Sequence, residues 1–418
     1  MPKQIVQDSS RATRRSLLAL AGAGVGLAGC ADIARLSPPP LTNAPAPPIL
    51  GIPNARFWAD GDVGPWIAEA QRAAEARQAT VGQARDLPPA NYLALSGGGD
   101  FGAFGAGLMV GWTESGTRPK FDVVTGISAG ALIAPFAFLG PDYDPQLRDV
   151  FTGISPADVL VLGRLITAVL FGEAIADTSP LYRLISRHTD QSMMEAIARE
   201  YDRGRLLLIG TTNLDVRRPV VWNIGAIARS GHPGALALFR DILLASASIP
   251  GAFPPVLVDL EQDGRRYQEM HVDGGAATQV FLYPPALDLR SERLGLIPRR
   301  ARTAWVVRNG RVDVEAGQVN RGIFGIARRS IETLLHFSGI SDIQRIYLTT
   351  LRDGVSFRLA AIGPEFNAPR QQPFDNAFMR ALFAYGEELG RTGAGWVDSP
   401  PPVGVLIPDA SLQDEATR

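Results

Sequence analysis

Ser128 is the residue in this sequence with the clearest potential for chemistry. It lies between Gly126 and Gly130, after a β-branched run at residues 121–125 and before an apolar, helix-like run at residues 129–136. Glycines two positions before and after a serine leave room for a sharp strand-to-helix turn, because they carry no Cβ atom. Such a turn exposes the hydroxyl at a helix N-terminus and is typical of a serine that attacks acyl groups.

A second turn of this kind contains Gly97, Gly98 and Gly99. It follows a strand-like run at residues 92–95 and precedes a helix expected at residues 103–112. Successive glycines let backbone N–H groups converge on an anion, and the helix dipole adds positive potential there. A nucleotide phosphate is one candidate, but the Gly-Lys-Ser/Thr sequence of nucleotide-binding P-loops is missing. We therefore expect the three N–H groups to stabilise an oxyanion during acyl transfer.

Asp273 ends a third strand-like run, at residues 267–272, and is followed by Gly274 and Gly275. A carboxylate that is hydrogen-bonded to Ser128 can accept its proton directly, which predicts a catalytic Ser128–Asp273 dyad without histidine. The alternative is that the Asp-Gly pair forms the turn of a β-hairpin.

Three motifs, at residues 96–102, 126–130 and 273–275, together resemble the signature of the patatin-like phospholipase family in order and spacing. The resemblance covers residues 90–285. It implies a lipid ester substrate, such as a phospholipid or lysophospholipid, and an acyl-enzyme mechanism that needs no cofactor. The chain departs from the family at Phe101, where an arginine or lysine is usual, so positive charge from that side chain is missing.

A Ser-Asp-His triad is the main mechanistic alternative. In the chain order serine, acid, histidine, Asp259 would pair with His271, and Asp273 would pair with His336. His336 lies in a helical sequence and His271 in a strand, whereas a catalytic histidine is expected on a loop. His271 is two residues before Asp273, so both are expected on one face of a strand, where His271 could position the site.

The alternation of strands and helices predicts a three-layer α/β/α sandwich with a mainly parallel central sheet, patatin-like in arrangement, whose catalytic residues lie at the carboxyl ends of strands. Further strands are expected at residues 205–213, 219–223 and 304–309, and helices at residues 66–84, 235–248, 323–338 and 376–389. Residues 159–171 are apolar around every face, which predicts either a buried helix or a lid over the site.

The first 29 residues read as a signal peptide. A start with several arginines, which resembles a twin-arginine export signal at residues 13–18, precedes a short apolar run at residues 17–28. Residues 27–30 resemble the lipobox of bacterial lipoproteins, which implies that Cys30 is lipidated and becomes the N-terminus. An uncleaved apolar anchor is the alternative. The chain has one cysteine, so we expect no disulfide.

These features divide the chain into four parts. Residues 1–29 are the signal peptide, residues 30–56 a lipidated, proline-rich tether, residues 57–392 the acyl hydrolase domain, and residues 393–418 a proline-rich, acidic tail. The lipid anchor would hold the protein in a bacterial cell envelope. Ala31 after the cysteine favours the outer membrane over the inner one, by resemblance to known sorting.

Composition limits the function classes. The 418 residues carry a net charge of −1, which argues against nucleic acid as a partner. Four scattered histidines and one cysteine give no metal-ligand pattern. Two other functions use the same residues: a broad carboxylesterase or acyltransferase, and a lipid-binding envelope lipoprotein that has lost activity, which Phe101 suggests.

Overall fold

The computed structural model describes residues 35–40, 47–82, 87–154, 156–159, 161–162, 176–290, 300–313, 317 and 319–401. Its strands are β1 (Arg56–Trp58), β2 (Ala90–Leu95), β3 (Val123–Ile127), β4 (Val161–Leu162), β5 (Ala176–Asp177), β6 (Leu206–Asn213), β7 (Arg218–Asn223), β8 (Val256–Gln262), β9 (Arg265–Asp273), β10 (Arg302–Arg311) and β11 (Ser356–Ile362). Its helices are α2 (Gly64–Val81), α3 (Gly102–Glu114), α4 (Ala129–Leu139), α5 (Asp144–Thr152), α6 (Pro156–Val159), α8 (Ser179–His188), α9 (Gln191–Asp202), α10 (Ile224–Arg229), α11 (Ala235–Ala247), α12 (Ile323–Asp353) and α13 (Asn376–Thr392), with 3-10 turns η1 (Gly99–Phe101), η2 (Pro141–Tyr143) and η3 (Gly274–Ala276).

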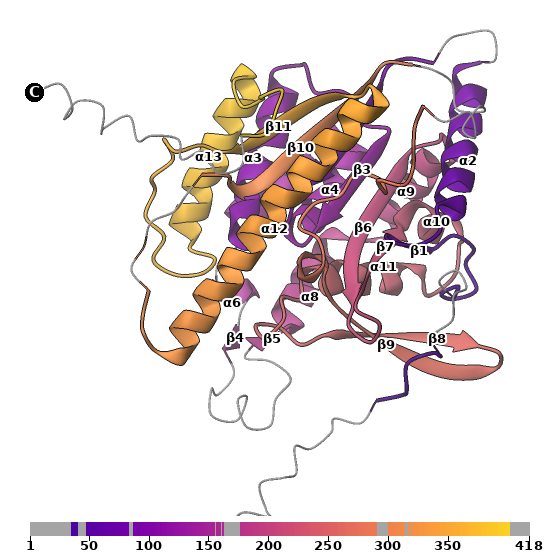
Figure 1. Ribbon diagram of the computed structural model, residues 1–418, viewed down its shortest axis with the longest axis horizontal. Coiled ribbons are helices and arrows are strands. Elements are labelled where there is room, and N and C mark those ends of the chain that lie inside the picture. Colours follow the sequence, from indigo (N-terminus) through magenta and orange to yellow (C-terminus); the bar gives the residue numbers. More distant parts are fainter. Residues whose placement is uncertain are drawn as a thin grey trace, which may run out of the picture.

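A mixed sheet forms the centre of the molecule (Figure 1). Its strand order is β1-β7-β6-β3-β2-β10-β11, and β9 pairs with β6 while β8 pairs with β9. Five neighbouring strands of the sheet, β6, β3, β2, β10 and β11, run parallel to one another. Strands β1, β7, β8 and β9 pair antiparallel. The prediction of a mainly parallel central sheet is confirmed.

Alternate residues of β2 show that helices cover both faces of this sheet. Leu93 and Leu95 pack in one core cluster with Phe104 of α3. Ala94, which lies between them, packs in a separate cluster with Ile343 of α12. Because successive side chains of a strand point to opposite faces, α3 and α12 lie on opposite sides of the sheet. The three-layer α/β/α architecture is therefore confirmed.

Helix α3, which follows the glycine loop, is held against α13 by close backbone contact. A Cβ atom on Gly107 would collide with the carbonyl of Phe383, and one on Gly390 would collide with the carbonyl of Leu108. Glycine lets the two helices approach until their backbones touch. This packing fixes the middle of α3, the helix that follows the glycine loop.

The segments on either side of the expected domain belong to its core in part, which corrects two predicted boundaries. Ile49 and Ile52 are buried in the main core, so residues 47–56 are not a tether. At the other end, the ring of Trp396 lies 4.7 Å from that of Trp112 and 4.9 Å from that of Trp305. Apolar burial at both ends outweighs the proline content on which the tether and tail were predicted.

Several predicted features fall outside the described residues: the signal peptide, Cys30, and most of the apolar segment at residues 159–171. Among the described helices, none combines the length and apolar character needed to cross a bilayer.

Candidate active site

Ser128 lies in a sharp turn between β3 and α4, with φ of 55° and ψ of −123°. A positive φ is costly for any residue with a Cβ atom, so the surrounding structure must hold it. A Cβ atom on Gly126 would lie 2.5 Å from the carbonyl oxygen of Gly130, and one on Gly130 would collide with the carbonyl of Leu95. The sharp turn at Ser128 therefore requires glycine at both positions.

The side chain of Ser246, in α11, holds this turn in place through hydrogen bonds. The backbone N–H of Ser128 donates to Oγ of Ser246 over 3.0 Å, and that hydroxyl donates to the carbonyl of Gly210 over 2.7 Å. Ser246 is fully buried. One hydroxyl thus ties the serine turn to α11 and to the neighbouring strand β6, which helps to hold the strained backbone.

Asp273 reaches Ser128 from the end of β9. Strand β9 pairs antiparallel with β6, so that Asp273 lies opposite Thr211. The Asp273 carboxylate accepts the N–H of Gly275 over 2.7 Å, and the side chain of Ser128 favours its charged form. Ser128 and Asp273 are each 5% exposed.

Burial sets the acidity of this carboxyl group. Loss of water raises the pKa of Asp273 from 3.8 to about 6, although the hydrogen bonds from Ser128 and Gly275 oppose the rise. A carboxylate with a pKa near neutrality accepts a proton more readily than an exposed aspartate, and it is still ionised at pH 7. The arrangement is suited to general-base chemistry on the serine hydroxyl.

The glycine loop lies beside the serine. A Cβ atom on Gly97 would stand 3.2 Å from the Cβ of Ser128. The N–H of Gly97, however, donates to the carbonyl of Gln279 over 3.0 Å, so it does not face an anion as expected. The N–H groups of Gly98 and Gly99 make no hydrogen bond with any described residue. Two of the three predicted donors thus have no partner among the described residues, whereas Gly97 anchors the loop to Gln279.

Asn309, at the carboxyl end of β10, holds the loop from the other side. Its backbone N–H donates to Oγ of Ser96 over 2.8 Å, and its Nδ2 donates to the carbonyl of Ser96 over 2.7 Å. Its Oδ1 accepts the N–H of Gly105 over 3.1 Å. Sequence reasoning treated Asn309 only as the end of a strand. A buried polar residue at a strand's carboxyl end, next to the expected site, was the signal available.

Arg370 supplies a positive charge beside the loop, which sequence reasoning did not find. Its Nε donates to Oδ2 of Asp100 over 2.7 Å, and the N–H of Phe374 donates to the same oxygen over 2.9 Å. Its guanidinium carbon lies 5.3 Å from the ring centroid of Phe101. The cation that Phe101 cannot provide thus comes to this region from residue 370, which is distant in sequence.

His271 is fully buried, and other partners occupy both of its ring nitrogens. Nδ1 lies 3.0 Å from Oγ1 of Thr211, which also accepts Nε1–H of Trp222 over 2.8 Å. The threonine proton therefore points to Nδ1, and Nε2–H donates to Glu269 over 3.1 Å. Glu269 in turn forms an ion pair with Arg56. Burial lowers the pKa of His271, which keeps the ring neutral.

The geometry does not support a histidine triad. His271 is held by Thr211 and Glu269, and Asp259 is exposed on β8, where it accepts a hydrogen bond from Gln268. His336 lies within the long helix α12, in contact with Phe337. Among the described residues, Asp273 is the ionisable residue whose side chain interacts with that of Ser128.

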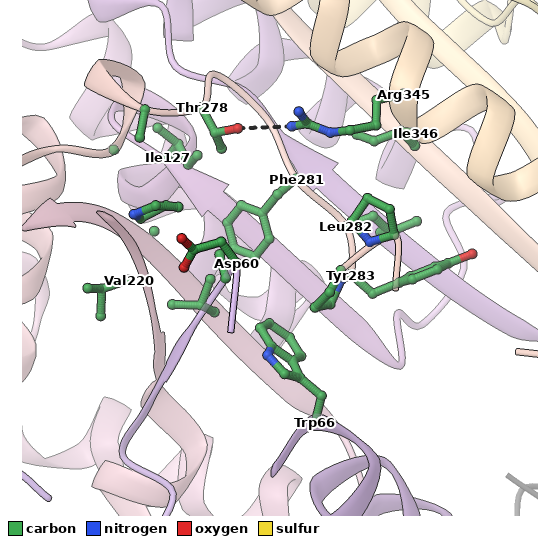
Figure 2. A pocket seen from close by; sticks show the side chains of 18 of the residues that line it. Asp60, Trp66, Ile127, Val220, Thr278, Phe281, Leu282, Tyr283, Arg345 and Ile346 are labelled. Atoms are coloured by element: carbon green, nitrogen blue, oxygen red, sulfur yellow. Dashed lines mark hydrogen bonds between the residues drawn. The ribbon is translucent and has the colours of Figure 1, made fainter. Parts of the chain in front are cut away.

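An apolar cavity of about 290 Å³ lies behind the strand ends (Figure 2). Ile127 and Gly274, which adjoin the serine and the aspartate, line it, but Ser128 and Asp273 do not. The cavity therefore adjoins the site without including either reacting side chain. At the edge of the cavity, the guanidinium of Arg345 donates a hydrogen bond to Oγ1 of Thr278 over 3.0 Å (Figure 2).

Within the part of the chain that the structure describes, no group of three histidine, cysteine, aspartate or glutamate side chains could hold a metal ion. The candidate residues can be understood as a serine nucleophile, a carboxylate base and a pair of amide donors.

The chain is similar to one described family and to a solved structure. Residues 93–285 match the family model described as patatin-like phospholipase. Among solved structures, the chain is similar to VipD from Legionella pneumophila, with 13% identity, a TM-score of 0.34, and coverage of 74% of this chain and 67% of that chain. No curated protein matched the sequence. Ser128, Asp273 and the glycine loop all lie within the matched residues, so the part of the chain that carries the candidate site is similar to the patatin-like phospholipase family.

Proposed function

We propose that this protein hydrolyses acyl ester bonds of phospholipids or lysophospholipids, with Ser128 as nucleophile and Asp273 as general base. The observation that carries the proposal is that the two side chains interact, with Ser128 favouring the charged form of the Asp273 carboxylate, at the end of a strand and beside a glycine loop. The patatin-like phospholipase domain supports lipid acyl hydrolysis at the level of the family.

In the first step, Oγ of Ser128 attacks the ester carbonyl carbon while its proton moves to the Asp273 carboxylate. The carbonyl oxygen becomes an oxyanion, which the N–H groups of Gly98 and Gly99 and the positive end of α3 stabilise. When the carbon–oxygen bond of the ester breaks, protonated Asp273 gives its proton to the leaving alcohol. The acyl group remains on Ser128.

In the second step, water attacks the acyl-enzyme and Asp273 takes one of its protons. The same amide donors stabilise the second oxyanion. Collapse of this intermediate returns the proton to Oγ of Ser128 and releases a fatty acid. Each carboxylate protonation is reversed within its own half-reaction, so one acidic residue serves both steps.

Two other functions share these groups. An acyltransferase or broad carboxylesterase would use the same acyl-enzyme but a different acceptor or acyl group. Phe101 is the observation that favours an inactive lipid-binding protein. Against inactivity stand the open amide donors of Gly98 and Gly99, and the guanidinium of Arg370 near the Phe101 ring.

We further propose that Cys30 carries a lipid anchor in a bacterial cell envelope, at the outer membrane. The lipobox-like residues 27–30 support this. Metabolic labelling with a radioactive fatty acid tests it: the wild-type protein should incorporate label, and a Cys30→Ala variant should not. Label that persists in the variant would place the lipid elsewhere.

The function is tested by hydrolysis of p-nitrophenyl butyrate and of phosphatidylcholine. We expect Ser128→Ala and Asp273→Asn to lower kcat on both substrates by at least about a thousandfold, since each removes a group from the covalent step. His336→Gln should keep most of the activity and serves as the matched control. Far-ultraviolet circular dichroism checks that each variant is folded.

The outcomes separate the candidates. A histidine variant as inactive as Ser128→Ala would replace the dyad by a triad. A folded wild-type protein that turns over neither ester, and whose Ser128 does not react with a fluorophosphonate probe, would be a lipid-binding protein.

A further inference from the structure

Helix α12 extends well beyond the sheet that it covers. Its carboxyl half packs on the sheet through Ile343 and Ile346. Gly339 lies against Arg308, near the carboxyl end of β10, where an added Cβ atom would stand 2.7 Å from the guanidinium carbon. Residues 323–338 come before this contact, and at about 1.5 Å per residue they project about 24 Å past it. Figure 1 shows this end of α12 reaching past the strands.

This projecting half carries an exposed apolar stripe. We use the term for five side chains, each 47% to 79% exposed: Ile323, Ile326, Ile331, Leu334 and Phe337. At about 100° per residue they fall within roughly 140° of the helix circumference. No side chain of residues 323–338 whose exposure the structure describes is buried. Single exposed apolar residues are common on proteins, but several large ones gathered on one face of a helix mark an interaction surface.

Cations border the apolar stripe on both sides. Arg328 and Arg329 each fall about 60° beyond one edge of the stripe, by the same helical geometry. Glu332 lies on the opposite face of the helix and is near both arginines, at 3.7 Å and 3.6 Å. With the apolar stripe facing a bilayer, the two guanidinium groups would lie at the level of the lipid phosphates, and the carboxylate would face water.

The stripe is on the side of the molecule that holds the candidate site. Strands β2, β3 and β10 run parallel, so their carboxyl ends share one edge of the sheet. The glycine loop follows β2, Ser128 follows β3, and the connection to α12 leaves from the end of β10. The projecting half of α12 therefore lies at the edge of the sheet that carries the candidate site.

We propose that residues 323–338 dock on an anionic phospholipid bilayer, with the apolar stripe among the acyl chains and Arg328 and Arg329 on the phosphates. A second copy of the chain is a poorer occupant, because two such helices would bring like-charged arginines together. Docking serves the lipid hydrolysis proposed above, but it rests on the surface of α12 and not on the dyad.

Flotation with vesicles tests the docking. The full-length chain is made with Cys30→Ala, so that no lipid anchor is attached, and mixed with vesicles of phosphatidylcholine alone or with 30% phosphatidylglycerol (about the fraction needed for a clearly anionic surface). We expect binding to the anionic vesicles, and a loss of at least tenfold in the double variant Leu334→Ser/Phe337→Ser. Arg328→Gln/Arg329→Gln should abolish the preference for anionic lipid.

Leu348→Ser is the matched control. Leu348 is 63% exposed and Leu334 is 69% exposed, on the same helix. The two are about 21 Å apart along the helix axis, so the control lies outside the projecting half. It should bind vesicles like the unsubstituted chain. Hydrolysis of p-nitrophenyl butyrate, which needs no membrane, should be equal in all stripe variants and reports an intact site.

Two results would overturn the proposal. One is equal vesicle binding by the double variant and the Leu348→Ser control. The other is a wild-type dimer, seen by sedimentation, that Leu334→Ser/Phe337→Ser converts to a monomer, since the stripe would then contact a second copy. A chain that binds vesicles through the stripe but hydrolyses no ester would retain the docking surface and refute the proposed function alone.

Discussion

Asp273→Asn should abolish hydrolysis and at the same time stabilise the fold. Asparagine has the shape of aspartate, so its Oδ1 can accept the N–H of Gly275 and its Nδ2 can donate to Oγ of Ser128. The substitution removes the charge and the ability to accept a proton, but it leaves the packing unchanged. The variant therefore distinguishes the role of Asp273 in catalysis from the effect of its buried charge on the stability of the fold.

The expected gain follows from the pKa of Asp273, which burial raises from 3.8 to about 6. Each pKa unit corresponds to about 1.4 kcal/mol, so ionising this buried group costs the native state about 3 kcal/mol relative to the unfolded chain. Below pH 3.8 the carboxyl group is protonated in both states and there is no cost. As pH rises towards 6 the unfolded chain ionises first and the cost grows; above 6 it is constant.

The assay is urea unfolding of the wild-type protein and of Asp273→Asn at several pH values between 4.5 and 8. The advantage of the variant in free energy of unfolding should increase up to about pH 6 and then level off near 3 kcal/mol. Asp241→Asn is the matched control, because burial also raises the pKa of Asp241 to about 6. It should show a similar but smaller trend, since Asp241 is partly exposed, and it should keep full hydrolytic activity.

Two results would refute this reasoning. A difference between Asp273→Asn and wild type that does not change with pH would mean that the carboxylate is not the source of the cost. A variant that is less stable than wild type at pH 8 would mean that the charge of Asp273 is favourable where it lies.

Three further outcomes are expected. Ser246→Ala should lower the free energy of unfolding by about 1 to 3 kcal/mol, because it leaves the buried N–H of Ser128 and the carbonyl of Gly210 unpaired; urea unfolding checks this, and an unchanged midpoint contradicts it. Arg370→Ala should lower kcat by about tenfold or more, because Asp100 loses its cation. Arg370→Lys should recover part of the lost activity. Equal kcat values for the wild type and both variants would show that the Arg370–Asp100 ion pair is not needed. Since Asp273 must be ionised to accept a proton, kcat/KM should fall about tenfold per pH unit below about pH 6; a flat profile from pH 5 to 8 excludes it as the base.

Local sequence was enough to predict the elements that carry the site. The turns at Ser128 and at Gly97 could be located because each depends on glycines next to the residue concerned, and the strand before each is a short apolar run. Strand β9 was found for the same reason. The hairpin partner β8 and the edge strand β11 were missed, since neither ends in a residue with evident chemistry.

The residues that support the site could not be found in this way. Ser246, Asn309 and Arg370 act through contacts with residues far away in sequence. Nothing local distinguishes Ser246 and Arg370 from other polar residues, and for Asn309 the one local signal was its place at the carboxyl end of a predicted strand. Gly97 was assigned the wrong task because its hydrogen bond to the carbonyl of Gln279 depends on the return of the chain after β9. The proline-rich stretch hid Ile49, whose burial depends on the tertiary fold.

The position of β10 has a consequence for the protein as it is synthesised. This strand lies between β2 and β11, and its Asn309 bonds to Ser96, 213 residues earlier in the chain. The ribosome therefore produces Ser128 and Asp273 well before the residues that hold the glycine loop in place. A nascent chain that stops after residue 285 contains every motif of the family but has an unpaired edge at β2. The proposed hydrolytic activity should accordingly arise only after residue 370 has emerged, when synthesis of the chain is almost complete.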